Sequence, residues 1–246
     1  MPQTGNLPAH EPDLTLGHHI LGWAERYIVQ PDGENAGAPW RFTPEQRHFI
    51  LWLYALKPDG GWVYTEATLR RAKGFGKTPL LAALAIIEFI GPCRWTGQIK
   101  TAKNGTLIPV GKPVHLPLVQ LAATSLDQTA QTMDMIRGML SESPAEREYD
   151  LDISKTMIQF KGNRPGKITP VTSSTRGNEG ARPTFAWPRQ ADRLPGPRAV
   201  CRSRRDAPLG AQQRRPGVLR DPGPQHEQDP FAGFAGRPDD QRVRPQ

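Results

Sequence analysis

The pentapeptide GFGKT at residues 74–78 is the feature that most constrains how this chain can fold. Residues 62–72 before it are rich in β-forming side chains and predict a strand, while residues 79–90 after it are almost wholly apolar and predict a buried helix. Backbone N–H groups left unpaired where a strand turns into a helix converge on phosphate, and the helix N-terminus adds partial positive charge. The segment therefore predicts a phosphate-binding loop in an α/β fold.

Each residue of the loop has a predicted role. Gly74 and Gly76 let the backbone come close to a phosphate, Lys77 reaches the β- and γ-phosphates of ATP, and the Thr78 hydroxyl ligates Mg²⁺. The usual GxxxxGK[ST] pattern has a glycine where this chain has Arg71, which departs from the motif. ATP and Mg²⁺ are thus the expected cofactors.

A helix start is predicted upstream of the loop. Thr43 can cap the helix, Pro44 suits the first helical position, and Gln46 can reach back as in a capping box. This helix is expected to run on to the turn at residues 58–61, and a shorter amphipathic helix is expected over residues 20–29.

Downstream of the loop, the sequence predicts several strands and one further helix. Residues 94–116 predict a loop-like insertion, and residues 118–123 predict a buried parallel strand followed by a helix over 127–140. Residues 156–160 and 168–172 flank a turn and predict a hairpin, and a further strand is expected to begin at residue 183.

The character of the chain changes near residue 187. Residues 187–246 hold 12 Arg, no Lys, 6 Asp and 1 Glu, a net charge of +5, together with 10 Pro and no apolar periodicity. We expect three parts: a lead with a short helix over 1–39, a partial P-loop ATPase domain with a mostly parallel sheet over 40–186, and a disordered Arg/Pro-rich tail over 187–246.

Several classes of protein have no support in the sequence. No apolar run approaches the roughly 18–20 residues of a membrane span, and the first residues lack the layout of a secretory signal. Cys93 and Cys201 match no metal-ligand or redox spacing. A cytoplasmic protein without a membrane partner is expected.

Four segments resemble the large terminase subunit of tailed bacteriophages, in particular the type found in actinobacterial phages. They are residues 40–46, residues 70–78, residues 119–130, and residues 173–174 together with 179–185, in the family's order. The resemblance implies an ATP-driven motor that packages double-stranded DNA into procapsids, with a small terminase subunit and a portal protein as partners in the host cytoplasm. It also implies that Gln46 contacts adenine and that Arg71 senses the γ-phosphate. The alternative for Gln46 is a side chain that only caps its helix.

One part of the family's pattern is missing. In the family the strand near residue 184 ends in Asp-Glu, which holds Mg²⁺ and activates water, whereas this chain contains no Asp-Glu dipeptide. The nuclease domain of the family has no counterpart either. The sequence therefore predicts no catalytic residues, leaves open whether the chain is an enzyme, and favours an inactive fragment that is truncated or out of frame after about residue 186.

Two other functions remain open at this point. The chain could be a different P-loop NTPase, such as a helicase-like ATPase, or a non-enzymatic basic protein that binds nucleic acid through its Arg-rich tail. The second alternative predicts steeply salt-dependent DNA binding by residues 187–246 alone.

Overall fold

The computed structural model describes residues 7–65, 67–71, 74–103, 105, 107–123, 126–172, 183–189 and 198–201. The helices are α1 (Gly17–Tyr27), α2 (Pro44–Leu53), α3 (Lys77–Ile90), α4 (Leu126–Leu140) and α5 (Pro144–Tyr149). The strands are β1 (Ala67–Arg70), β2 (Arg94–Thr101), β3 (Leu107–Lys112), β4 (Leu118–Ala123), β5 (Leu151–Ile153), β6 (Ile158–Phe160), β7 (Lys167–Thr172), β8 (Phe185–Arg189) and β9 (Arg198–Cys201).

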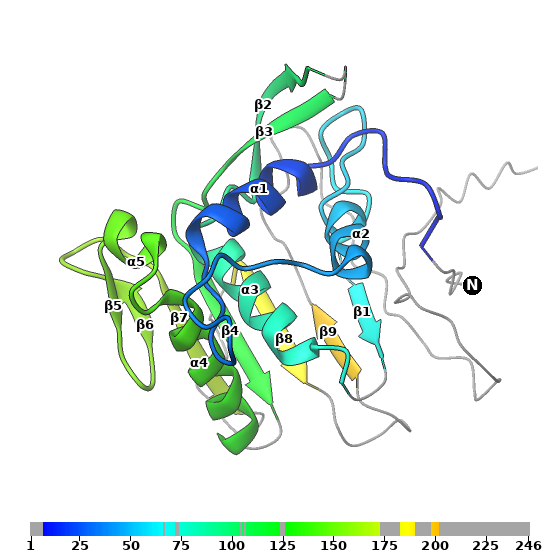
Figure 1. Ribbon diagram of the computed structural model, residues 1–246. Helices are drawn as coiled ribbons and strands as arrows, with labels where there is room; N and C mark the ends of the chain where they lie inside the picture. Colours follow the sequence, from blue (N-terminus) through cyan, green and yellow to red (C-terminus); the bar gives the residue numbers. More distant parts are fainter. Residues whose placement is uncertain are drawn as a thin grey trace, which may run out of the picture.

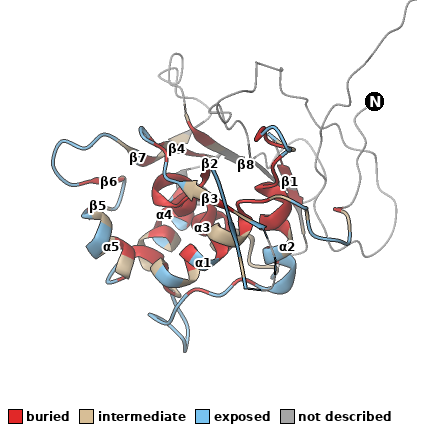
Figure 2. Ribbon diagram, turned by 90° about the horizontal axis from the view of Figure 1, so that it is seen from above, coloured by how far each residue is buried: buried red, intermediate tan, exposed pale blue. Residues whose placement is uncertain are grey.

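The main sheet is mixed rather than mostly parallel. Its order is β5-β6-β7-β4-β8, with β4 parallel to both β7 and β8, while the β5–β6 and β6–β7 pairs are antiparallel. Strand β9 contacts β8 and pairs antiparallel with β1. Figures 1 and 2 show the described helices on one side of this sheet. The expected mostly parallel sheet is wrong because the short strands after α5 fold back as tight hairpins, which require antiparallel pairing.

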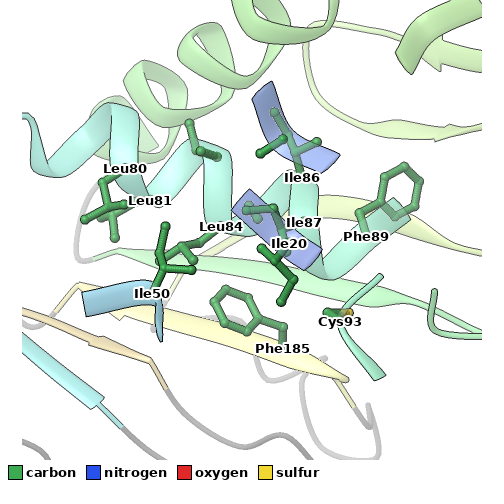
Figure 3. Close-up of a cluster of buried hydrophobic side chains, with 14 of the residues drawn as sticks. Ile20, Ile50, Leu80, Leu81, Leu84, Ile86, Ile87, Phe89, Cys93 and Phe185 are labelled. Atoms are coloured by element: carbon green, nitrogen blue, oxygen red, sulfur yellow. The ribbon is translucent and has the colours of Figure 1, made fainter. Parts of the chain in front are cut away.

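Helix α3 forms the centre of the core. Every residue from Leu80 to Ile90 is buried, because α4 packs beside the helix and strands β4 and β7 lie beneath it. Figure 3 shows Leu84 and Ile87 of α3 in one apolar cluster with Phe185 of β8. A helix that is covered on several sides needs apolar residues nearly all round, which explains its sequence. None of the helices among the described residues is long and apolar enough to cross a membrane.

The predicted start of α2 is confirmed. The Thr43 side chain accepts a hydrogen bond from the Gln46 backbone, the Gln46 side chain accepts one from the Thr43 backbone, and Pro44 occupies the first turn. The helix ends at Leu53, short of the turn at residues 58–61, because Leu56 instead bridges to Trp62.

Other boundaries differ from the expectation. The strand before the loop spans only Ala67–Arg70 instead of residues 62–72. Residues 94–116 contain the β2–β3 hairpin in place of a loop-like insertion. The predicted hairpin at residues 156–172 is confirmed as β6 and β7, but the neighbouring α5 and β5 have no counterpart in the prediction.

The boundary near residue 187 falls inside a strand. Strand β8 runs from Phe185 to Arg189, and β9 lies still further along the chain. The strand expected to begin at residue 183 is confirmed as β8. Part of β8 and all of β9 lie within residues 187–246, where we expected a disordered tail. Pairing with β4 and β1 supplies backbone hydrogen bonds that do not depend on apolar periodicity. Residues 190–197 and 202–246 lie outside the described residues.

Candidate nucleotide-binding site

The described part of the loop between β1 and α3 turns at its two glycines. Gly74 (φ 95°) and Gly76 (φ 80°) both adopt left-handed conformations, which L side chains enter only at a cost. Gly76 is the N-cap of α3, and its carbonyl accepts a hydrogen bond from the Leu80 backbone at 3.0 Å. The two glycines thus turn the chain from the strand into the positive end of a buried helix.

Gln46 lies beside this loop. Its Nε2 atom stands 3.5 Å from the carbonyl oxygen of Phe75, at the long limit of a hydrogen bond, and a Cβ atom on Gly76 would lie 3.4 Å from the same nitrogen. Gln46 is buried and also forms half of the capping box of α2. The capping interpretation of Gln46 is therefore correct, and the same side chain is also in contact with the loop.

Lys77 and Arg71, on either side of the glycine turn, are joined by a hydrogen bond. The Lys77 Nζ atom donates a hydrogen bond to the Arg71 carbonyl oxygen at 2.8 Å, and the Arg71 guanidinium carbon lies 4.9 Å from the centre of the Phe75 ring. Hydrogen bonds from its own backbone and from Thr43 lower the pKa of Glu45, and the charge of Arg71 lowers it further. The lysine is thus held at the loop by a carbonyl group.

The structure brings all six predicted site residues to one place. Gln46 comes from α2, Arg71 follows β1, Gly74 and Gly76 form the turn, and Lys77 and half-buried Thr78 begin α3. The donor set suits a nucleotide phosphate, because it combines a lysine, a helix N-terminus and two glycines that leave the backbone accessible. Thr78 would supply a hydroxyl oxygen of the kind that Mg²⁺ binds.

Strand β8 brings no carboxylate to these groups. The residues of β8 are Phe, Ala, Trp, Pro and Arg, and the described residues contain no group of three His, Cys, Asp or Glu that could hold a metal ion. Ser173, Ser174, Thr124, Ser125 and residues 179–182 of the terminase-like segments lie outside the described residues.

Sequence reasoning overlooked two features around the site. Phe75 provides the ring over which Arg71 lies, and Glu88 of α3 forms a buried ion pair with Arg94. A signal for the second was present, since Glu88 is the single carboxylate of α3 and lies among its apolar residues. A buried carboxylate needs a charged or hydrogen-bonding partner, and this requirement predicts one nearby.

An α/β fold with a glycine-bearing loop between a strand and a buried helix makes this chain a candidate nucleotide-binding protein. Comparisons with known proteins show which nucleotide-binding proteins it is similar to. The chain is 33% identical over 202 residues to the Gene 13 protein of Mycobacterium phage D29, covering 74% of this chain and 32% of that protein. It is 34% identical over 195 residues to the Gene 13 protein of Mycobacterium phage L5, covering 71% and 31%.

A third relative has an explicit name. The large terminase subunit of Enterobacteria phage HK97 is 34% identical over 79 residues, which cover 32% of this chain and 15% of the relative. A crystal structure of the HK97 large terminase aligns with a TM-score of 0.45 at 18% identity, covering 70% of this chain and 30% of that chain. No family model matches.

These relatives confirm the resemblance inferred from the four segments. The chain is a relative of the bacteriophage large terminase subunit and corresponds to the N-terminal part of it. It spans about a third of the length of the two mycobacterial phage proteins that it matches.

Proposed function

We propose that this chain is a partial ATPase module of the large-terminase type, which binds ATP and Mg²⁺ at the loop of residues 74–78 but hydrolyses ATP poorly. The observation that supports binding is the geometry of the loop, where two left-handed glycines lead into α3 and place Lys77 at its first turn. In this proposal Lys77 and the backbone hold the phosphates, Thr78 ligates Mg²⁺, Gln46 contacts the adenine and Arg71 senses the γ-phosphate.

The proposal of poor hydrolysis follows from the missing carboxylates. Neither an Asp-Glu dipeptide in the sequence nor a carboxylate on β8 is present to position the attacking water. A positioned general base contributes about 10²–10⁴-fold to such reactions. Double-stranded phage DNA, a small terminase subunit and a portal protein are the partners that the relationship suggests for the complete machine.

Binding of a fluorescent ATP analogue with Mg²⁺ tests the site. We expect Lys77→Ala to weaken binding about ten- to a hundredfold, because a charge-assisted hydrogen bond to phosphate contributes about 1.5–3 kcal/mol. Lys155→Ala removes an exposed lysine elsewhere and should leave affinity unchanged. Equal affinity of the Lys77→Ala variant and the original chain would contradict the site, and Lys77-dependent ATP turnover at an ordinary enzymatic rate would contradict the proposed inactivity.

The same assay separates the two roles of Gln46. Thr43→Ala and Gln46→Ala each remove half of the capping box, so both should destabilise α2 by about 1 kcal/mol. We expect the Gln46 variant alone to lose the preference for ATP over GTP. If both variants bind the two nucleotides alike, Gln46 has no role in base recognition.

A further inference from the structure

The β2–β3 hairpin stands apart from the apolar core. Figure 1 shows it projecting beyond the main sheet, past α1. Its outer part is solvent-exposed, with Ile99 at 45% and Leu107 at 48% of their full accessibility, and the two strands pair antiparallel up to Thr101 and Leu107. Packing of the core therefore does not explain why this ribbon is present.

The base of the hairpin is nevertheless held in place. Arg94 forms a buried ion pair with Glu88 of α3 at 2.9 Å, and the Gly111 backbone donates a hydrogen bond to His19 Nδ1 of α1 at 2.9 Å. The Trp95 ring packs directly on Gly60, where a Cβ atom would overlap it. The exposed ribbon is thus attached to the body of the protein at several points.

The charge of the hairpin is of one sign. Lys100, Lys103 and Lys112 are exposed, and the sequence has no Asp or Glu between Glu88 and Asp127. None of the three lysines forms an ion pair within the described part of the structure, whereas Lys161 pairs with Asp150. Burial lowers the pKa of His19 at the hairpin base, and the nearby charge of Lys100 lowers it further.

We propose that the β2–β3 hairpin contacts the phosphate backbone of double-stranded DNA through Lys100, Lys103 and Lys112. A two-stranded ribbon is narrow enough to enter the major groove, and lysines on flexible stems suit phosphate contacts. The exposed side chain of Gln98 adds a further hydrogen-bonding group on the same ribbon. The identity of the partner rests on the proposed function, but the contact does not depend on nucleotide binding.

Salt-dependent binding of a short fluorescent DNA duplex to the full chain tests the proposal. The triple variant Lys100→Gln, Lys103→Gln, Lys112→Gln should lower the slope of log affinity against log salt by about 2–3, because each lost phosphate contact contributes about 0.9. At about 100 mM salt we expect affinity to fall at least about tenfold.

A matched control removes the same charge from another surface. Lys155→Gln, Lys161→Gln, Lys167→Gln changes three exposed lysines around β5–β7, and the Arg-rich residues 187–246 are retained in both variants. This control variant should change the salt slope and the DNA affinity much less than the hairpin variant does. Replacing the three hairpin lysines by arginine should retain binding, which guards against a loss caused by misfolding.

Equal DNA affinity of the hairpin and control variants would overturn the proposal. Any DNA binding would then come from the overall positive charge of the protein. Both triple variants should bind the ATP analogue like the original chain. If Lys77→Ala leaves nucleotide affinity unchanged while DNA binding still depends on the hairpin lysines, only the nucleotide site is refuted. If Lys77→Ala weakens nucleotide binding while the hairpin variant binds DNA like its control, only the hairpin proposal is refuted.

Discussion

Among single residues, Glu88 is notable because its carboxylate is buried and therefore needs charged or hydrogen-bonding partners. It is fully buried, accepts a hydrogen bond from the Tyr54 hydroxyl at 2.9 Å and pairs with Arg94 at 2.9 Å. Burial alone would lower the pKa of Arg94, but the charge of Glu88, its hydrogen bond to Arg94 and the nearby Cys93 and Tyr54 together raise that pKa above its ordinary value. The trio joins the end of α2, the end of α3 and the start of β2.

Breaking this pair should destabilise the protein strongly. Glu88→Ala leaves a buried guanidinium without its carboxylate, and such a loss costs about 3–5 kcal/mol. The double variant Glu88→Leu, Arg94→Met should recover most of that free energy of unfolding, since apolar replacements of buried pairs are often tolerated. Urea denaturation measures both.

The exposed Asp134–Arg137 pair provides the comparison. Its two atoms lie 3.1 Å apart at the surface of α4, so Asp134→Asn should cost about 0–1 kcal/mol. If Glu88→Ala costs no more than Asp134→Asn, the buried pair does not have the role in stability that its burial implies.

At the scale of elements, α3 begins at a residue whose backbone only glycine adopts easily. Gly76 is the left-handed N-cap of the helix, with a φ of 80°. Gly22 lies within α1, is exposed, and has no atom within 4 Å of the place where a Cβ would stand. The backbone at residue 76 therefore favours glycine, whereas the backbone at residue 22 can accept a side chain.

The same substitution should have opposite effects at these two positions. Gly76→Ala forces an L side chain into the left-handed region and should destabilise the protein by about 1–2 kcal/mol. Gly22→Ala should stabilise it by about 0.5–1 kcal/mol, because alanine loses less backbone entropy in a helix. Thermal unfolding gives both signs, and a stabilising Gly76→Ala would exclude strain at the loop.

At the scale of the whole molecule, β8 completes the main sheet. It pairs in parallel with β4 through residues Phe185–Arg189, and the Phe185 side chain is fully buried under α3. Strand β8 therefore covers one edge of β4. Residues close to the change in composition therefore contribute to the core.

Phe185→Ala should consequently cost about 3–5 kcal/mol, the usual loss for a buried phenylalanine. Leu116→Ala removes an apolar side chain that is 56% exposed and should stay within about 0.5 kcal/mol of the original chain. Urea denaturation of the two variants compares them directly. A loss for Phe185→Ala as small as that for Leu116→Ala would mean that β8 is not a stable part of the fold.

Local chemistry made several features predictable. The capping box at Thr43 and Gln46 is set by hydrogen bonds between residues three apart. The extents of α3 and β4 follow from runs of apolar residues that end at glycine or polar positions. The terminase resemblance rests on the same short segments, and the mycobacterial phage and HK97 relatives confirm it.

Pairing between distant segments was not predictable in the same way. The β2–β3 hairpin lacks a strong strand pattern because its outer residues face solvent, and its attachment depends on His19 and Glu88, far from the turn itself. Strands β8 and β9 gain their backbone hydrogen bonds from β4 and β1, about 60 or more residues earlier in the chain.

The phosphate-loop pattern, the buried helix after it and the relationship to large terminase subunits can be read from the sequence, because each depends on residues close together in the chain. The contact of Gln46 with the Phe75 carbonyl, the Glu88–Arg94 pair and the pairing of β8 with β4 are visible only in the folded chain. These contacts join segments that meet only when the apolar faces of several elements are buried together, and no local pattern encodes that meeting.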